Sequence, residues 1–204
     1  MTFSIWLSLF MVCMLGAMSP GPSLAMVAKH SLAGGRANGL ATAWAHAAGI
    51  GVYAFITMIG LGVLLVQAPM IFKGITLLGA IYLLYLGWNA LRSKGGVVEK
   101  LEKGNQASLW QAAKEGLMIS LLSPKIMVFF TALFSQFVAL ADSTSNQLVI
   151  VATPLVVDGL WYTLITLLLS SPLFIEKIRS KAVLIDRMTG VVLIALGIRV
   201  LLTL

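Results

Sequence analysis

Long apolar runs separated by short polar segments account for most of the chain, and there are six such runs. A helix needs about 20 apolar residues to cross a bilayer, and each run is long enough for one crossing. The pattern therefore predicts an all-α membrane protein with six transmembrane helices. The predicted spans are about 3–28, 37–66, 70–91, 116–140, 148–169 and 183–204.

Two of these runs are interrupted by Ser-Pro. The first contains Ser19-Pro20-Gly21-Pro22, and the fourth contains Ser123-Pro124 followed by Lys125. Proline removes a backbone donor and clashes with the preceding turn, so we expect both helices to be broken there. One break alone is explained equally well by a kink that only shapes packing. Two interrupted membrane helices in corresponding positions of the two halves indicate a transporter binding site.

A polar stretch at 93–115 separates two halves, about 1–92 and 116–204, within a single membrane domain spanning 1–204. Basic residues gather in the first, third and fifth connections between the spans, and such residues favour the cytoplasmic side. We therefore expect both termini to be periplasmic. Three spans per half then predict two inverted three-helix repeats. The basic residues of these connections are Lys29, Arg36, Arg92, Lys94, Lys100, Lys103, Lys114, Lys177, Arg179, Lys181 and Arg187.

The composition excludes an ordinary soluble domain, because only 10% of the residues are charged and the mean hydropathy is +0.99. The positive-inside bias explains the net charge of +7 better than nucleic-acid binding does. Cys13 is the single cysteine, so no disulfide can form within the chain. The sequence has no metal-ligand spacing, nucleotide loop or nucleophile triad. We expect no metal, no cofactor and no enzymatic activity, and an ion gradient as the energy source.

The two breaks and one nearby cation suggest a site for an anion. A helix that begins inside the membrane after Pro22 would present free N–H groups, from Ser23 onward, to a carboxylate. Lys125 directly follows the second break. It could bind the same carboxylate or neutralise an acid elsewhere in the bundle.

Asp158 is the acid closest to the middle of a predicted span, and an intramembrane carboxylate is expensive. It could bind a substrate ammonium, carry a proton, or form a structural pair with Lys125. Pro154, Asp158, Trp161 and Tyr162 fall on one face of the fifth span. This face would form an aromatic wall, and we expect Trp161 to contact substrate.

His46 lies on one face of the second span with Gly49 and Tyr53, and we expect Tyr53 to contact substrate. The helical rise places His46 roughly 8 Å from the depth of Asp158, so a water or a substrate could join them. The two residues are a plausible proton-coupling pair. The alternative is a histidine that only forms hydrogen bonds within the bundle. His30, at the first connection, is expected to be solvated.

At these residues the sequence resembles the LysE/RhtB family of bacterial amino-acid exporters. Ser123 stands where the family pattern has asparagine, which keeps the break but changes one potential ligand. The resemblance covers nearly the whole chain. Its segments are Ser19-Pro20-Gly21-Pro22; Gly35-Arg36-Ala37-Asn38-Gly39-Leu40 with His46-Ala47-Ala48-Gly49; Gly79-Ala80-Ile81-Tyr82-Leu83-Leu84-Tyr85-Leu86-Gly87-Trp88; and Ser123-Pro124-Lys125 with Gln136-Phe137.

The resemblance implies export of amino acids across the bacterial inner membrane, driven by the proton-motive force. With only Asp158 available for an ammonium, we expect neutral substrates similar to homoserine, threonine or leucine. The substrate would bind between the breaks, and the two halves would rock about it.

Three other classes were considered. One is a cation transporter of the same broad superfamily, and another is a non-transporting scaffold, which would not need Asp158. A thiol-redox carrier would need a pair of cysteines, which this chain lacks. The sequence leaves the oligomeric state open, a homo-oligomer included.

Overall fold

The structure is a computed structural model that describes residues 1–204 except 20, 94–106, 142, 170, 171, 203 and 204. At 172–179 and 182 it describes the backbone alone. All regular elements in the described residues are helices, so the predicted all-α class is confirmed. In chain order they are α1 (Phe3–Met18), α2 (Pro22–Gln67), α3 (Pro69–Leu91), α5 (Leu109–Leu121), α6 (Pro124–Ser135), the 3-10 helix η1 (Val138–Leu140), α7 (Thr144–Leu168) and α8 (Pro172–Leu202).

Three of these helices, α2, α3 and α7, are long and apolar enough to cross a membrane. The α5–α6 pair is bent by 54° and makes a fourth if it is counted as one span. α1 has only 16 residues, and α8 carries Asp186, Arg187 and Arg199 in its apolar part. Among the described residues, length and composition therefore support three or four spans.

α2 corrects the prediction of a basic turn at 29–36. Its 46 residues would measure roughly 70 Å as one straight helix, far more than a bilayer is thick. The only non-helical residue inside it is Gly35, with φ 74° and ψ −167°. That left-handed φ suits glycine, which has no Cβ to clash. One residue, in place of the predicted turn, thus separates 22–34 from 36–67.

Three other helices begin earlier than the apolar runs predict. α5 begins at Leu109 after the cap residue Ser108, and α7 begins at Thr144 after the cap residue Ser143. Each serine side chain accepts a hydrogen bond from a backbone N–H of the first turn, at 3.2 and 3.3 Å. α8 begins at Pro172, where proline is favoured as a first helical residue. Polar or charged residues lie between each of these helix starts and the apolar run that follows, so a reading based on hydrophobicity places the starts too late.

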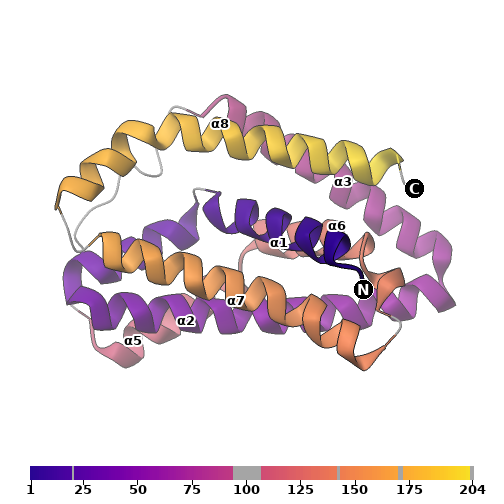
Figure 1. The fold of residues 1–204 in the computed structure, drawn as a ribbon, viewed down its shortest axis with the longest axis horizontal. Helices are drawn as coiled ribbons and strands as arrows, with labels where there is room; N and C mark the ends of the chain where they lie inside the picture. The colour runs from indigo at the N-terminus through magenta and orange to yellow at the C-terminus, as the bar shows by residue number, and fades with distance from the viewer. Residues whose placement is uncertain (20, 94–106, 142, 170–171, 203–204) are drawn as a thin grey trace.

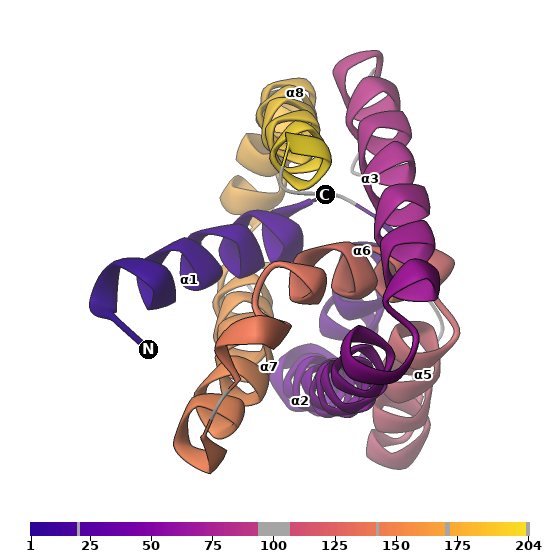
Figure 2. The ribbon, with the colours of Figure 1, turned by 90° about the vertical axis from the view of Figure 1, so that its right-hand side faces the viewer.

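The helices form two groups with a layer between them. α2, α5 and α7 pack together on one side, and α3 pairs with α8 on the other (Figures 1 and 2). α1 and α6 lie between the groups, where α1 contacts α7 and α8 while α6 contacts α2 and α3. α1 ends at the first Ser-Pro segment and α6 begins at the second. Both segments are therefore close to the centre of the molecule.

The largest hydrophobic cluster joins this middle layer to both groups. Phe129, Phe130 and Phe134 of α6 stack edge to face along the helix, with ring centroids 5.6 and 5.4 Å apart. Large apolar side chains also cover the outside of the helices, for example Val66, which is 81% exposed, and Leu78, which is 68% exposed. A soluble protein rarely exposes so much apolar surface, whereas a lipid-facing surface requires it.

α3 and α8 approach each other so closely that only glycine fits at their crossing. A Cβ added to Gly190 would lie 2.7 Å from the carbonyl oxygen of Gly87, and one added to Gly87 would lie 2.7 Å from that of Gly190. The atoms in the way are backbone, which cannot rotate aside. Small residues permit this close helix packing in lipid, where hydrophobic association is weak.

Gly190→Val should therefore separate α3 from α8 and destabilise the protein by about 1–3 kcal/mol, as overpacking does. The measurement is the thermal unfolding midpoint of the detergent-purified protein. Gly74→Val is the matched control, because nothing lies within 4 Å of a Cβ built at that position. Equal midpoints for the two variants would contradict the close contact.

Candidate functional site

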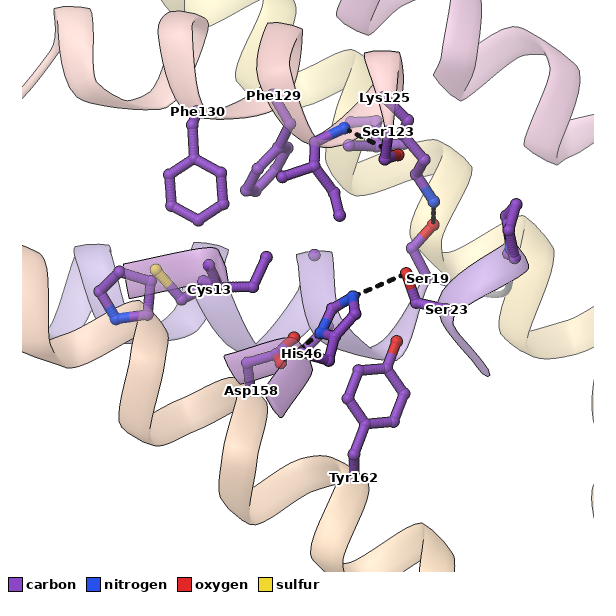
Figure 3. A pocket seen from close by; sticks show the side chains of 18 residues that line it. Cys13, Ser19, Ser23, His46, Ser123, Lys125, Phe129, Phe130, Asp158 and Tyr162 are labelled. Carbon is purple, nitrogen blue, oxygen red and sulfur yellow. Dashed lines mark hydrogen bonds and ion pairs between the residues drawn. The ribbon is translucent and has the colours of Figure 1, made fainter. Parts of the chain in front are cut away.

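A cavity of about 60 Å³ lies between the two helix groups, next to both Ser-Pro segments. Figure 3 shows its polar side chains on two sides, with the aromatic rings of α6 facing it. α1, α2, α6, α7, α8 and both Ser-Pro segments contribute to its walls. Its lining residues are Cys13, Gly16, Ala17, Ser19, Gly21, Pro22, Ser23, His46, Ile50, Ser123, Lys125, Ile126, Phe129, Phe130, Pro154, Asp158, Tyr162 and Leu193.

His46 and Asp158 form one wall of the cavity and contact each other directly. His46 Nδ1 lies 2.7 Å from Asp158 Oδ2, and both side chains are buried. The sequence placed the two at depths roughly 8 Å apart, so that a water or a substrate could join them and direct contact needed the side chains to reach. The side chains do reach each other, because α2 and α7 pack together. The ring of Tyr162 meets His46 edge-on, with centroids 5.2 Å apart.

The hydrogen bonds of His46 assign its tautomer. A carboxylate only accepts, so Nδ1 carries a hydrogen and donates it to Asp158. The other ring nitrogen, Nε2, lies 2.9 Å from Ser23 Oγ. A hydroxyl both donates and accepts, so Ser23 can pair with Nε2 whether or not that nitrogen holds a proton. Asp158, His46 and Ser23 therefore form a chain that can accept or release one proton without losing a hydrogen bond.

Lys125 forms the opposite wall, and its Nζ donates a hydrogen bond to Ser19 Oγ (Figure 3). Asp158 pairs with His46 and not with Lys125. The structure therefore does not show the alternative of a structural Asp158–Lys125 pair. The cavity thus has a carboxylate on one side and an ammonium on the other. The apolar side chains of Ile50, Phe129 and Phe130 also line it.

The helices that begin at the two Ser-Pro segments have different first turns. Ser123 Oγ accepts the N–H of Ile126 at 3.4 Å, so the N-terminus of α6 is capped by its own side chain. α2 begins at Pro22 after Gly21, and no described side chain caps its first turn. Free N–H groups at a helix N-terminus favour an anion. The N-terminus of α2 is therefore the better place for a carboxylate.

The structure brings together most of the residues expected at the site but not all of them. Tyr53 and Trp161, both expected to contact substrate, do not line the cavity. The Tyr53 hydroxyl donates to the carbonyl of Leu121 at 3.0 Å, and Trp161 packs against a cluster that includes Tyr162. Pro124 is also absent from the cavity lining, and Pro20 lies outside the described residues.

The structure also corrects the expectation for His30 and reveals a second buried acid. His30 is 0% exposed, and its Nε2 lies 2.9 Å from Glu115 Oε2. Asp186 is buried in α8, accepts a hydrogen bond from Ser93, and acts electrostatically on Lys125. Sequence reasoning missed Asp186 because it placed the start of the last helix at 183. In the structure that helix begins at Pro172, so Asp186 lies near its middle.

Phe129 and Phe130 were also missed, although a signal for them exists. They lie one to two turns after Pro124 on a helix that starts at a break, so the break carries them to the centre of the molecule. No group of three or more His, Cys, Asp or Glu within the described ranges is placed to hold a metal ion.

Comparison with known proteins gives the chain a family. Residues 14–204 match the family model described as LysE type translocator. The chain is 25% identical over 205 residues to the threonine efflux protein of Escherichia coli strain K12, covering 98% of each. It is 29% identical over 148 residues to the leucine efflux protein of Enterobacter sp. strain 638, covering 70% of this chain and 68% of that protein.

A membrane protein of Haemophilus influenzae named only as uncharacterized is 28% identical over 197 residues, covering 94% of this chain and 93% of that protein. No solved structure matches the chain. The family match spans both Ser-Pro segments and every residue that lines the cavity except Cys13. The protein therefore belongs to the LysE type translocators, a family of membrane transporters, not enzymes.

Proposed function

We propose that the protein exports neutral amino acids across the bacterial inner membrane in exchange for protons. The observation that carries this proposal is the cavity, with Asp158 and His46 on one wall and Lys125 beside the free N-terminus of α2 on the other. The two charged walls complement the two charges of an amino-acid zwitterion. The names of the threonine and leucine efflux relatives agree with such a substrate.

In the proposed complex, the carboxylate accepts hydrogen bonds from the first N–H groups of α2 and from Lys125. The ammonium donates to Asp158. The substrate side chain then lies against Ile50, Phe129 and Phe130, which suits an aliphatic or small polar group. These rings are buried within the core, so a longer charged side chain would lose its hydration there.

The contact between His46 and Asp158 supplies a mechanism for proton exchange. A protonated His46 and the substrate ammonium compete for one carboxylate, because each neutralises Asp158. Arrival of the ammonium therefore favours release of the His46 proton, and departure of the substrate favours its return. Ser23 keeps His46 hydrogen-bonded in both states. Protons entering down their gradient would thus drive amino acids outward.

The packing supports two inverted three-helix halves. The first half would have three spans: a broken span made of α1 and residues 22–34, then residues 36–67, then α3. The second half would have a broken span made of α5 and α6, then α7, then α8. In such a repeat α1 corresponds to α5 and 36–67 to α7. The contact of α1 with α7 then has its counterpart in the contact of α5 with α2, and α3 contacts its own equivalent, α8. Both termini are proposed to be periplasmic, and alternating access to be rocking of the halves.

The role of Lys125 is tested by substrate competition in inverted membrane vesicles. Uptake of labelled threonine or leucine should be inhibited by the unlabelled amino acid more strongly than by the amine that lacks its carboxylate. Lys125→Gln should reduce this preference roughly tenfold, since a hydrogen bond to a charged group contributes about 1.5–3 kcal/mol. Lys73→Gln, an exposed lysine of α3, is the matched control. An unchanged preference in Lys125→Gln would remove Lys125 from the proposed site.

The roles of Asp158 and His46 are separated by measuring gradient-driven efflux beside amino-acid exchange at zero gradient. Asp158→Asn should lower both at least tenfold, because ammonium and proton lose their shared partner. His46→Gln should reduce gradient-driven efflux more strongly than exchange and weaken the effect of a proton uncoupler. Leu160→Ala, which faces outward on the same helix as Asp158, is the control.

Full uncoupler-sensitive efflux by Asp158→Asn would contradict the exchange mechanism. Export of lysine or arginine, with no export of neutral amino acids, would contradict the substrate class.

A further inference from the structure

A second hollow, of about 330 Å³, lies between the beginning of α2 and the α5–α6 bend. We call it the side groove. Pro22 and Ser123 line both the side groove and the central cavity, so the two spaces share part of a wall. Met26, Met118 and Ile119 give the side groove an apolar wall, and Glu115 is its acidic residue. Because it adjoins the cavity, the side groove offers a short route from the surface to the proposed substrate site.

Glu115 lines the side groove and joins α5 to the first segment of α2 beside this route. Its Oε2 lies 2.8 Å from Lys29 Nζ and 2.9 Å from His30 Nε2, while Gln111 Nε2 donates to its Oε1 at 2.6 Å. Lys29 and Glu115 are 40% and 25% exposed, whereas His30 is fully buried. The cluster therefore extends from the surface into the protein and spans the gap between the two helices.

Within the described part of the chain, the closed cluster leaves one buried polar atom without a hydrogen bond, which destabilises the closed arrangement. His30 Nδ1 is buried and has no hydrogen-bond partner among the described residues. A buried ring nitrogen without a partner loses the hydrogen bond that water would supply. Separating α5 from the first segment of α2 would expose this nitrogen to water. The hydrogen bond gained with water would then offset part of the free energy lost when the ion pair breaks. A contact balanced in this way suits an element that must open and close.

We propose that the side groove is the entrance through which an amino acid reaches the central cavity, and that the Glu115–Lys29–His30 cluster is the gate that closes it. The identity of the cargo rests on the proposed function. Lys29 lies near the end of the first segment of α2, shortly before Gly35. The distribution of basic residues places this end on the cytoplasmic side, where an exporter takes up its substrate.

The chemistry of the gate favours a zwitterion with an apolar side chain. Such a molecule brings an ammonium that can replace Lys29 at Glu115 and a carboxylate that can pair with the released Lys29. A simple amine or carboxylic acid would leave one of the two protein charges without a partner, which is unfavourable in a partly buried site. The substrate side chain would contact Met26, Met118 and Ile119, and flexible methionines adapt to side chains of different shapes.

Cys13 makes the gate measurable in the native chain. It is the single cysteine, it lines the central cavity, and it is only 4% exposed. The measurement is the rate at which a cationic methanethiosulfonate reagent modifies Cys13 in the purified protein, with no amino acid present. Glu115→Gln removes the charge that holds Lys29 and His30, so the labelling rate should rise roughly tenfold. Loss of a negative charge disfavours approach of a cationic reagent, so a faster reaction would reflect opening.

Two further variants distinguish the gate from general loosening. Lys114→Gln removes the neighbouring exposed charge on α5 and should react like the wild type. Adding Met118→Trp to Glu115→Gln fills the side groove and should return the rate toward the wild-type value. Lys29→Gln breaks the same ion pair from the α2 side and replaces Glu115→Gln if that variant does not fold. Labelling of folded Glu115→Gln or Lys29→Gln at the wild-type rate, or no slowing by Met118→Trp, would overturn the proposal.

The labelling assay contains no substrate, so its result stands whether or not the protein exports amino acids. Leucine and isoamylamine, the amine left when leucine lacks its carboxylate, are then added separately to the wild type. The gate chemistry predicts that leucine changes the Cys13 labelling rate and that isoamylamine does not. Equal effects of the two would contradict the zwitterion as cargo while leaving the entrance itself supported by the variants.

Discussion

The contact between His46 and Asp158 is the interaction on which the rest of the site depends. A carboxylate inside a membrane is costly unless it is paired, and Asp158 obtains its partner only because α2 and α7 pack along each other. That packing also brings Ser23 and Tyr162 to the imidazole. The partner is an imidazole, whose ring nitrogen can donate to the carboxylate and so makes the buried acid tolerable.

The helix groups also depend on close packing between helices, and small residues make this packing possible. Gly87 and Gly190 let α3 and α8 meet backbone to backbone, and Gly116 brings α5 against the backbone of Thr42 on α2. These pairs hold the two helix groups together internally. The middle layer of α1 and α6 has aromatic side chains in place of such backbone contacts along much of its length. The cavity lies in that middle layer, against the rings of Phe129 and Phe130.

Sequence reasoning predicted the helical class, the family resemblance and most of the polar side chains around the cavity, because each depends on local chemistry. Proline predicts where a helix begins, and an acid in an apolar run predicts a functional group. Sequence reasoning could not predict which helices contact one another. It therefore placed Tyr53 and Trp161 at the site, left His30 in solvent and separated His46 from Asp158. Asp186 was missed for a local reason: charged residues between 176 and 181 interrupt the apolar pattern and hid the true length of α8.

The unequal first turns of α2 and α6 have a consequence for stereochemistry. Ser123 occupies the N-terminus of α6, so in the proposed complex the carboxylate has one helix end to bind, while Asp158 fixes the ammonium on the other side. The phenylalanine rings receive the third substituent of the α-carbon. Three different contacts at fixed positions can be satisfied by only one enantiomer. A cavity built with two equivalent helix ends would accept a substrate in either direction and would lose that chiral selection.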